Sequence, residues 1–338
     1  MRLTLAQARE ATQGSVLHAQ RFPPTFSIVT DTRTLEKNDV YLALRGERFD
    51  GHDFVGQAYR QGAAAAIVDR VPEQCEEIPC IVVGDTKAAY MDLARAARKQ
   101  FAGRVVALTG STGKTTTKTF LGCMLAPHYG DRVAATPGNE NNEIGVSKLL
   151  LSVQPDAEVV IVEMGARHYH DIAVLVEIAR PEVAILTNVG EAHLQIMGSL
   201  ERLAQTKWEI FQTGALPILN WNDPVCRAKC ASLVRQPRWF AAGEDFSEEN
   251  LPEHLTVVTP SSLSVRLGNA REEVSTEVTI PGAHNLSNVA AAAAAALAVN
   301  VPTRTIAAAI STLKLPSGRY ETIQIEGRAR IIYDAYNA

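Results

Sequence analysis

Residues 105–118, VVALTGSTGKTTTK, have the residue types of a phosphate-binding loop but not its usual spacing. The common nucleotide-binding pattern G-x-x-x-x-G-K-[ST] places its first glycine five residues before the second. Here that position is Leu108, and the glycine that precedes Gly113 is Gly110. A glycine turn between a strand and a helix N-terminus still directs backbone N–H groups at an anion, so a shorter phosphate loop is predicted. The alternative is a glycine turn that contains Lys-Thr by chance.

Lys114 and Thr115 have the side chains that a nucleotide site needs. Lys114 would reach the β and γ phosphates, and the Thr115 hydroxyl would ligate Mg²⁺. Glu163 follows the apolar residues 159–162, and a carboxylate at the end of a buried strand can hold Mg²⁺ directly. A later strand ends in further polar residues, namely Asn188, Glu191 and His193. Taken alone, a strand-end glutamate is as often simply solvated, and a single histidine is more often structural than a ligand. The agreement of three successive strand ends favours the site.

These side chains require a sheet that brings strand ends together. Short apolar segments alternate with segments of helical periodicity, a pattern typical of parallel strands with helices on both faces. The expected strands are residues 105–108, 159–162, 183–187 and 216–220, and the expected helices are residues 114–125, 171–179 and 200–212. Residues 255–280 alternate without helices and predict an antiparallel flap.

The rest of the chain predicts a small unit before this sheet and a strand pair after it. The first hundred residues indicate a separate small α/β unit, so a domain boundary is placed near residue 100. Residues 285–299 predict an alanine-rich helix, and residues 303–313 another with Thr303 as its N-cap. Two final strands, joined at Glu326 and Gly327, cannot bury a core alone. They either pack on the central domain or begin a third domain.

Composition excludes several classes of protein. The chain has 338 residues, 46% hydrophobic content and a net charge of −4, which argue for a globular protein and against a general nucleic-acid binder. The N-terminus has no apolar segment of a signal peptide, and the alanine run at 289–299 is too short to span a membrane. The five cysteines form no zinc-site spacing. A cytoplasmic protein is expected.

Longer segments closely resemble the Mur ligases of peptidoglycan synthesis, in particular the type that adds D-alanyl-D-alanine. They follow the family's order and spacing over most of residues 105–338: TGSTGKTTTK, TPGNENNEIGVSKLLL, VEMGARHYHDIAVLVEIARPEVAILTNVGEAHLQIMGSLERLAQTKWEIF, IPGAHNLSNVAAAAAAA, and LPSGRYE with IIYDAYNA. The short loop of residues 109–115 is the form that this family uses. TDTRTLEKNDVYLALRGERFDGHDF is similar, more loosely, to the family's uridine-nucleotide domain.

The resemblance implies an ATP-dependent ligase. ATP would phosphorylate the terminal carboxylate of UDP-N-acetylmuramoyl-tripeptide, and the amine of D-alanyl-D-alanine would attack the resulting acyl phosphate. Two Mg²⁺ ions are implied beside ATP, because two anions must meet. By resemblance, the catalytic residues are Lys114, His193 and Lys207, and the metal residues are Thr115, Glu163, His193 and Lys207. Lys207 would act through carbamoylation, which converts an ammonium into a carboxylate-like ligand.

The resemblance also assigns binding residues. Those for the nucleotide are Gly110, Ser111, Thr112, Gly113, Lys114, Thr115, Thr116, Asn285, Asn288, Arg319, Asp334 and Asn337. Those for the substrate are Asp31, Thr32 and Arg33 at the UDP end, and Asn141, Asn142 and Glu143 at the peptide end. Thr32 stands where the family more often has serine and keeps the hydroxyl. A helix cap followed by a packed alanine helix is an alternative for Asn285 and Asn288 and can coexist with binding.

Family members continue beyond this point as a Rossmann-like third domain that closes over ATP. We therefore expect an N-terminal domain of residues 1–100, a central ATP-binding domain of residues 101–314, and the beginning of a truncated third domain at residues 315–338. The chain alone is expected to be a weak or inactive monomer that contacts neither nucleic acid nor membrane. Three alternatives stay open: a sibling Mur ligase, a folylpolyglutamate-type ligase, and a non-catalytic nucleotide-binding relative.

Overall fold

The computed structural model describes residues 1–46, 48–190, 198–243, 251–268, 270–319, 321–325 and 329–333. Its chain divides into two compact units. The first contains residues 1–102, 142–156 and 177–179, and the second contains residues 103–141, 157–176 and 180–338. Helix α5 (Glu143–Ser152) therefore groups with the first unit, although it follows the first strands of the second in the chain.

The first unit is built on a five-stranded sheet in the order β1-β5-β4-β3-β2. Four strands are parallel and β1 is antiparallel to β5: β1 (Ser15–Leu17), β2 (Ile28–Val29), β3 (Val40–Leu42), β4 (Ala65–Val68) and β5 (Cys80–Val82). Its other helices are α1 (Leu5–Thr12), α2 (Val55–Arg60) and α3 (Thr86–Gln100), and α3 contacts both α1 and α5. This is the small α/β unit that the sequence predicts, with β3 and β4 buried along their whole length.

The second unit contains a nine-stranded sheet in the order β14-β13-β12-β11-β10-β9-β6-β8-β7. Its parallel strands are β6 (Arg104–Thr109), β7 (Val133–Ala135), β8 (Val159–Glu163), β9 (Val183–Leu186), β10 (Leu216–Asn220), β11 (Arg238–Ala242) and β12 (His254–Val258). Strands β6, β8 and β9 are adjacent, so the residues that follow them gather at one edge.

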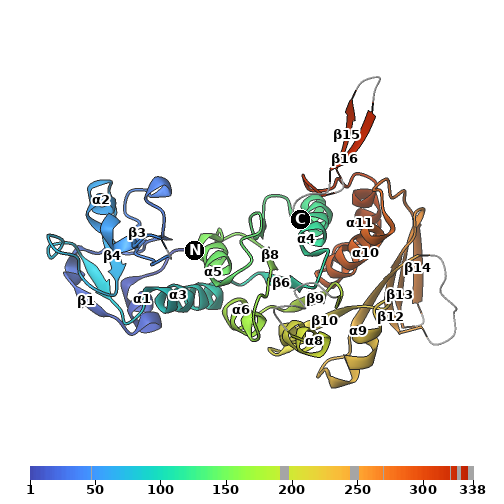
Figure 1. Cartoon of the computed structure of the whole chain (residues 1–338), viewed down its shortest axis with the longest axis horizontal. Coiled ribbons are helices and arrows are strands. Elements are labelled where there is room, and N and C mark those ends of the chain that lie inside the picture. The colour runs from blue at the N-terminus through green and yellow to red at the C-terminus, as the bar shows by residue number, and fades with distance from the viewer. Residues whose placement is uncertain are drawn as a thin grey trace. The chain divides into compact units, whose positions relative to one another are not determined.

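Helices cover both faces of this sheet. Helices α4 (Lys114–Tyr129), α10 (Ala283–Ala298) and α11 (Thr303–Ile310) lie on one face, and α6 (Asp171–Ala179), α8 (Leu200–Trp208) and α9 (Pro224–Lys229) lie on the other (Figure 1). None of the helices in the described part of the chain is long and apolar enough to span a bilayer.

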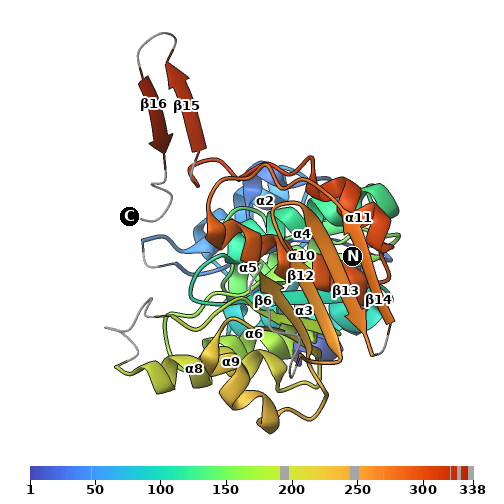
Figure 2. The same cartoon turned by 90° about the vertical axis from the view of Figure 1, so that its right-hand side faces the viewer.

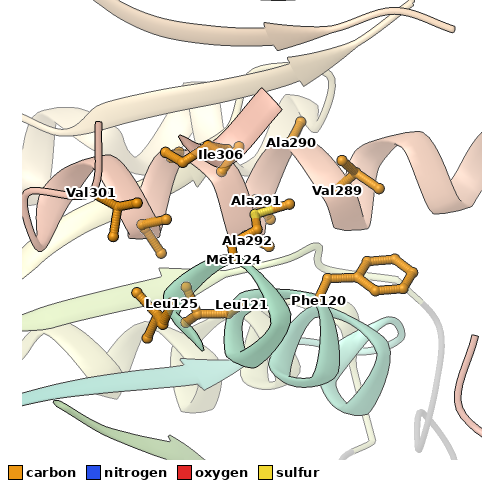
Figure 3. Close-up of a cluster of buried hydrophobic side chains, with 14 of the residues drawn as sticks. Phe120, Leu121, Met124, Leu125, Val289, Ala290, Ala291, Ala292, Val301 and Ile306 are labelled. Atoms are coloured by element: carbon orange, nitrogen blue, oxygen red, sulfur yellow. The ribbon is translucent and has the colours of Figure 1, made fainter. Parts of the chain in front are cut away.

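The alanine-rich helix α10 packs directly against the phosphate-loop helix α4. Figure 3 shows the small side chains of Ala291 and Ala292 of α10 on the side that faces α4, which contributes Phe120, Leu121, Met124 and Leu125. These residues are fully buried. Because alanine has only a methyl side chain, the backbones of α4 and α10 approach closely. The packing of α10 therefore holds α4 in its position.

The structure confirms the antiparallel strands expected within residues 255–280 and shows that they are part of the main sheet. Strands β13 (Ser262–Leu267) and β14 (Ala270–Ser275) are antiparallel, but they extend the main sheet from β12, which is itself parallel to β11 (Figure 2). The alternation at 276–280 does not form a strand. Period-two patterning identifies a strand with one exposed face, and it cannot say to which sheet that strand belongs.

Thr303 does not cap helix α11. Pro302 occupies the N-cap position in an extended conformation, Thr303 is already helical, and no side chain caps this end. Strands β15 (Glu321–Ile325) and β16 (Ala329–Tyr333) form a separate antiparallel pair. The expected turn at Glu326 and Gly327 lies outside the described residues.

All three tryptophans of the chain belong to the second unit. Trp208 ends α8, Trp221 follows β10 and Trp239 lies in β11. The Trp221 and Trp239 rings meet edge to face, with ring centroids 5.0 Å apart.

Candidate nucleotide site

Two glycines shape the loop between β6 and α4. Gly113 has φ of +79°, and a Cβ there would collide with Oδ1 of Asn288. A Cβ at Gly110 would collide with the hydroxyl of Thr187. Gly110 also has a positive φ, of +156°, so both positions favour glycine for their backbone conformation as well as for lack of space. Leu108 is fully buried in β6, as expected for a strand residue.

The loop is fastened to the end of the neighbouring strand β9. The Thr187 hydroxyl donates to the Thr112 carbonyl at 2.7 Å. The Asn188 amide donates to the Thr112 hydroxyl at 3.0 Å and accepts from the Thr112 backbone N–H at 3.1 Å. The Ser111 hydroxyl exchanges hydrogen bonds with backbone groups of Gly190. Such a loop holds its shape before a ligand arrives, which reduces the entropy lost on binding.

Lys114 folds back over this loop. Its ammonium donates to the carbonyls of Gly110 at 2.8 Å and Ser111 at 3.3 Å. Burial lowers the pKa of Lys114; among nearby charges, Glu163 raises it and Arg319 lowers it. A cation held mainly by neutral carbonyls is well suited to pair with an incoming phosphate.

Glu163 ends strand β8 and is 1% exposed. Its Oε1 accepts from the Thr115 hydroxyl at 3.1 Å and from the Asn141 amide at 3.0 Å. A hydroxyl and a carboxylate at this separation match the oxygen ligands that Mg²⁺ takes, so these residues fit that ion. Across the described residues no cluster of three or more His, Cys, Asp or Glu side chains exists.

Lys207 is buried on α8, with 2% of its surface exposed. Burial, and secondarily the charge of Lys114, lower the pKa of Lys207 to about 7. Its side chain makes no hydrogen bond or ion pair to another described residue. The expected catalytic lysine is therefore close enough to Lys114 to feel its charge, and part of its amine is neutral near pH 7.

A pocket of about 410 Å³ opens beside the loop. It is lined by Thr112, Gly113, Thr116, Asn188, His284, Asn285, Ser287, Asn288, Leu315 and Arg319. Arg319 donates to the Thr115 hydroxyl at 3.1 Å. The pocket thus joins the loop, the start of α10 and the segment before β15, which are far apart in the sequence.

Asn285 and Asn288 are buried in a hydrogen-bonded chain behind this pocket. The Asn285 amide donates to the Pro281 carbonyl at 2.7 Å, and Asn288 donates to Asn285 at 3.2 Å. The Thr117 hydroxyl donates to Asn288 at 3.3 Å and so links α10 to α4. These contacts are structural, but the expected helix cap is wrong, because Gly282 is the N-cap of α10 and no side chain caps that end. Both residues line the pocket, and their role in nucleotide binding stays a prediction.

The residues expected at the UDP end lie in the first unit, at its surface. Asp31 caps the short 3-10 turn Thr32–Thr34 by accepting from the Arg33 backbone N–H. The Arg33 guanidinium also bonds both oxygens of Asp31, and these hydrogen bonds lower the pKa of Asp31 to about 2.

The expected peptide-end residues have three different environments. Asn141 belongs to the second unit and bonds Glu163. Asn142 is the N-cap of α5 and accepts from the Gly145 N–H at 2.9 Å. Glu143 pairs with Lys87 at 2.6 Å inside the first unit. His193, Asp334 and Asn337, like Glu191, lie outside the described residues.

Lys118 is the main residue of this site that the sequence reasoning missed. Its ammonium lies 2.9 Å from Oε2 of Glu163 and is 6% exposed. The signal was its position four residues after Lys114, which places both lysines on one face of α4. His284, Ser287 and Leu315 were also missed, since pocket lining carries no sequence pattern.

Comparisons with known proteins agree with this geometry. Residues 26–101 match the model of the Mur ligase family, catalytic domain, and residues 108–296 match the Mur ligase middle domain. The chain is 36% identical to the UDP-N-acetylmuramoyl-tripeptide–D-alanyl-D-alanine ligase of Escherichia coli (strain K12) and 35% identical to that of Bacillus subtilis (strain 168). These alignments cover 92% of this chain and 69% and 67% of the relatives.

Solved structures give the same result. MurF from Acinetobacter baumannii has a TM-score of 0.84 at 32% identity and covers all of this chain and 74% of its own. MurF ligase from Thermotoga maritima in complex with ADP has a TM-score of 0.76 at 31% identity and covers 92% and 71%. With two family models matched and relatives this similar over more than two thirds of their length, the chain belongs to the Mur ligase family.

Proposed function

We propose that this chain carries the nucleotide site of an ATP-dependent ligase that joins D-alanyl-D-alanine to UDP-N-acetylmuramoyl-tripeptide through an acyl phosphate. The observation that carries the proposal is the convergence of Lys114, Thr115 and Glu163 beside the 410 Å³ pocket. The ligase names of the relatives and the ADP of the Thermotoga maritima structure support it. Peptidoglycan precursor synthesis by a monomer in the cytoplasm is the corresponding setting.

The residues have separate roles in this proposal. The loop backbone and the Lys114 ammonium hold the phosphates, and Thr115 and Glu163 hold Mg²⁺ at the start of α4. Mg²⁺ supplies positive charge where the γ phosphate meets the substrate carboxylate. Arg319 and Lys114 act in the same direction, because both place a cation beside the phosphates.

Lys207 supports a second metal position as a carbamate. A neutral amine is required for the addition of carbon dioxide, and the pKa of about 7 makes that form available. The second position would also use His193. Asn285, Asn288, Asp334 and Asn337 are proposed around the nucleotide.

The substrate residues are proposed by motif alone. Asp31, Thr32 and Arg33 would bind the UDP end, and Asn142 and Glu143 the peptide end. Asn141 is better placed to steady Glu163, with which it shares a hydrogen bond.

Phosphate release tests the proposal when it is measured with a panel of UDP-muramoyl peptides and amine acceptors, on a protein in which this chain continues into the family's third domain, because the chain alone is expected to be weak or inactive. Release with the tripeptide substrate and D-alanyl-D-alanine alone is expected. Turnover only with the dipeptide substrate and a single diamino acid would assign a sibling ligase, and turnover with folate substrates a folylpolyglutamate ligase. ADP binding without turnover on any pair would favour a non-catalytic relative.

A further inference from the structure

The two carboxylate oxygens of Glu163 have neighbours that differ in charge. Thr115 and Asn141 are neutral donors to Oε1, at 3.1 and 3.0 Å. Lys118 is a cation 2.9 Å from Oε2. Lys118 and Glu163 are 6% and 1% exposed, so water contributes little to the balance between them.

Lys118 also reaches the loop that precedes α5. Its ammonium donates to the carbonyl of Gly138 at 2.6 Å. The same loop is tied to the end of β8 by the Thr136 hydroxyl, which accepts from the Glu163 N–H at 2.9 Å, and by the Asn141 carbonyl, which accepts from the Gly165 N–H at 2.9 Å. A Cβ at Gly165 would collide with the Asn141 amide, so the loop and the strand end fit closely.

We propose that Lys118 is a positioning residue for Glu163. It occupies Oε2 and balances the charge of the carboxylate, which leaves Oε1, on the Thr115 side, as the oxygen that faces a divalent cation. Its hydrogen bond to the Gly138 carbonyl holds the loop of residues 136–141 in a fixed position relative to that carboxylate. This inference rests on the proposed function, because it assigns the metal to Thr115 and Glu163.

Because Lys118 is charged, the proposal predicts a change in metal affinity opposite to the one that structural damage would cause. A cation beside the carboxylate lowers its attraction for a second cation, while it fixes the carboxylate geometry. Loss of the charge should therefore tighten metal binding and at the same time slow the reaction. Ordinary structural damage would weaken both.

The experiment measures binding of Mn²⁺ by electron paramagnetic resonance in the presence of ADP, at the same pH for every variant. We expect Lys118→Met to bind Mn²⁺ about tenfold more tightly than the wild type. Ligase turnover should fall by at least about tenfold, since the carboxylate is no longer oriented. Asn141→Ala is the matched comparison: it removes a neutral donor to the same carboxylate, keeps the charge of Lys118, and should not reproduce the tenfold tightening of Mn²⁺ binding.

Unchanged or weaker Mn²⁺ binding by a folded Lys118→Met variant would overturn the inference. If that variant does not fold, Lys118→Arg decides, because it keeps the charge. Wild-type Mn²⁺ affinity is expected for it, and a tenfold change would contradict the proposal. Absence of ADP and Mn²⁺ binding by the wild type would instead remove the proposed function together with this inference.

Discussion

Lys207 shows how burial can prepare a single residue for modification. Below pH 7 its amine is protonated, and above pH 7 it is mostly neutral, because burial and Lys114 lower its pKa to about 7. Carbon dioxide adds only to the neutral amine. Between pH 6 and pH 8 the neutral fraction rises roughly tenfold.

We therefore predict that ¹³C-bicarbonate labels the chain with one carbamate signal in NMR spectra, strong at pH 8 and weak at pH 6. Lys207→Ala should lack the signal and lose ligase turnover, with partial recovery in added acetate or formate. A full-strength signal or wild-type turnover in the alanine variant would exclude this role. Lys229, a lysine on α9 whose ammonium lies over the Trp208 ring, offers Lys229→Ala as a control that keeps the signal.

Gly113 and Gly214 give a matched pair for separating backbone strain from lack of space. Both have φ of +79°, but nothing lies within 4 Å of a Cβ at Gly214, whereas a Cβ at Gly113 meets Asn288. Gly214→Ala should cost about 1–2 kcal/mol of unfolding free energy in urea, from the left-handed backbone alone.

Gly113→Ala should cost more, because Asn288 must also move, and it should abolish ADP binding. Isothermal titration with ADP checks the second part. Equal stabilities for the two variants, with ADP binding kept in both, would show that the loop tolerates a side chain.

At the scale of elements, the contact between α4 and α10 determines where the phosphate loop sits. Ala291 is fully buried on α10 against α4, so a larger side chain must push the helices apart. We predict that Ala291→Leu lowers the unfolding free energy by about 1–3 kcal/mol and weakens ADP binding.

Ala308→Leu is the control for this change, because Ala308 is an exposed residue of α11. Its stability, measured by the same urea titration, should stay within about 0.5 kcal/mol of the wild type. Similar losses in both variants would mean that helix packing is not the cause.

The elements around the site were largely predictable from the sequence. Helix 171–179 has the expected bounds, and the strands at 105–108 and 159–162 are each within one residue of them. Local apolar periodicity fixes such elements because each is a strand or helix with a buried face. The turn made by the two glycines of the loop could also be predicted, whereas their close contacts with Thr187 and Asn288 could not.

Contacts between segments that are far apart in the sequence could not be predicted from it. Lys118 pairs with Glu163 across 45 positions, and its spacing alone allows either a surface lysine or a buried one. The grouping of α5 with the first unit and the joining of β13 to the main sheet depend on packing in the same way. The error at Thr303 was local: Pro302 took the capping position that a threonine usually prefers.

At the scale of the whole molecule, unfolding of the second unit can be followed by a spectroscopic signal that the first unit lacks. All tryptophans lie in the second unit, with the phosphate loop and its pocket. Tryptophan fluorescence should therefore follow unfolding of that unit. We predict that ADP with Mg²⁺ at 100 times its Kd raises the unfolding free energy reported by tryptophan by about 2.7 kcal/mol.

Circular dichroism, which also detects the first unit, supplies the comparison. Its signal should contain a component that ADP leaves in place. An ADP-independent tryptophan transition would contradict the location of the nucleotide site.

Lys114 and Lys118 interact with Glu163, Lys207 is close to Lys114, and Arg319 bonds Thr115, in a chain whose net charge is −4. These charges should affect the rate at which ADP associates with the protein. A positively charged pocket attracts polyphosphates, while the remaining surface of a protein with net negative charge repels them. The association rate of ADP should therefore fall steeply as salt is added, while its dissociation rate changes little. Stopped-flow binding at several ionic strengths separates the two rates, and a salt-independent association rate would show that these cations act only after contact.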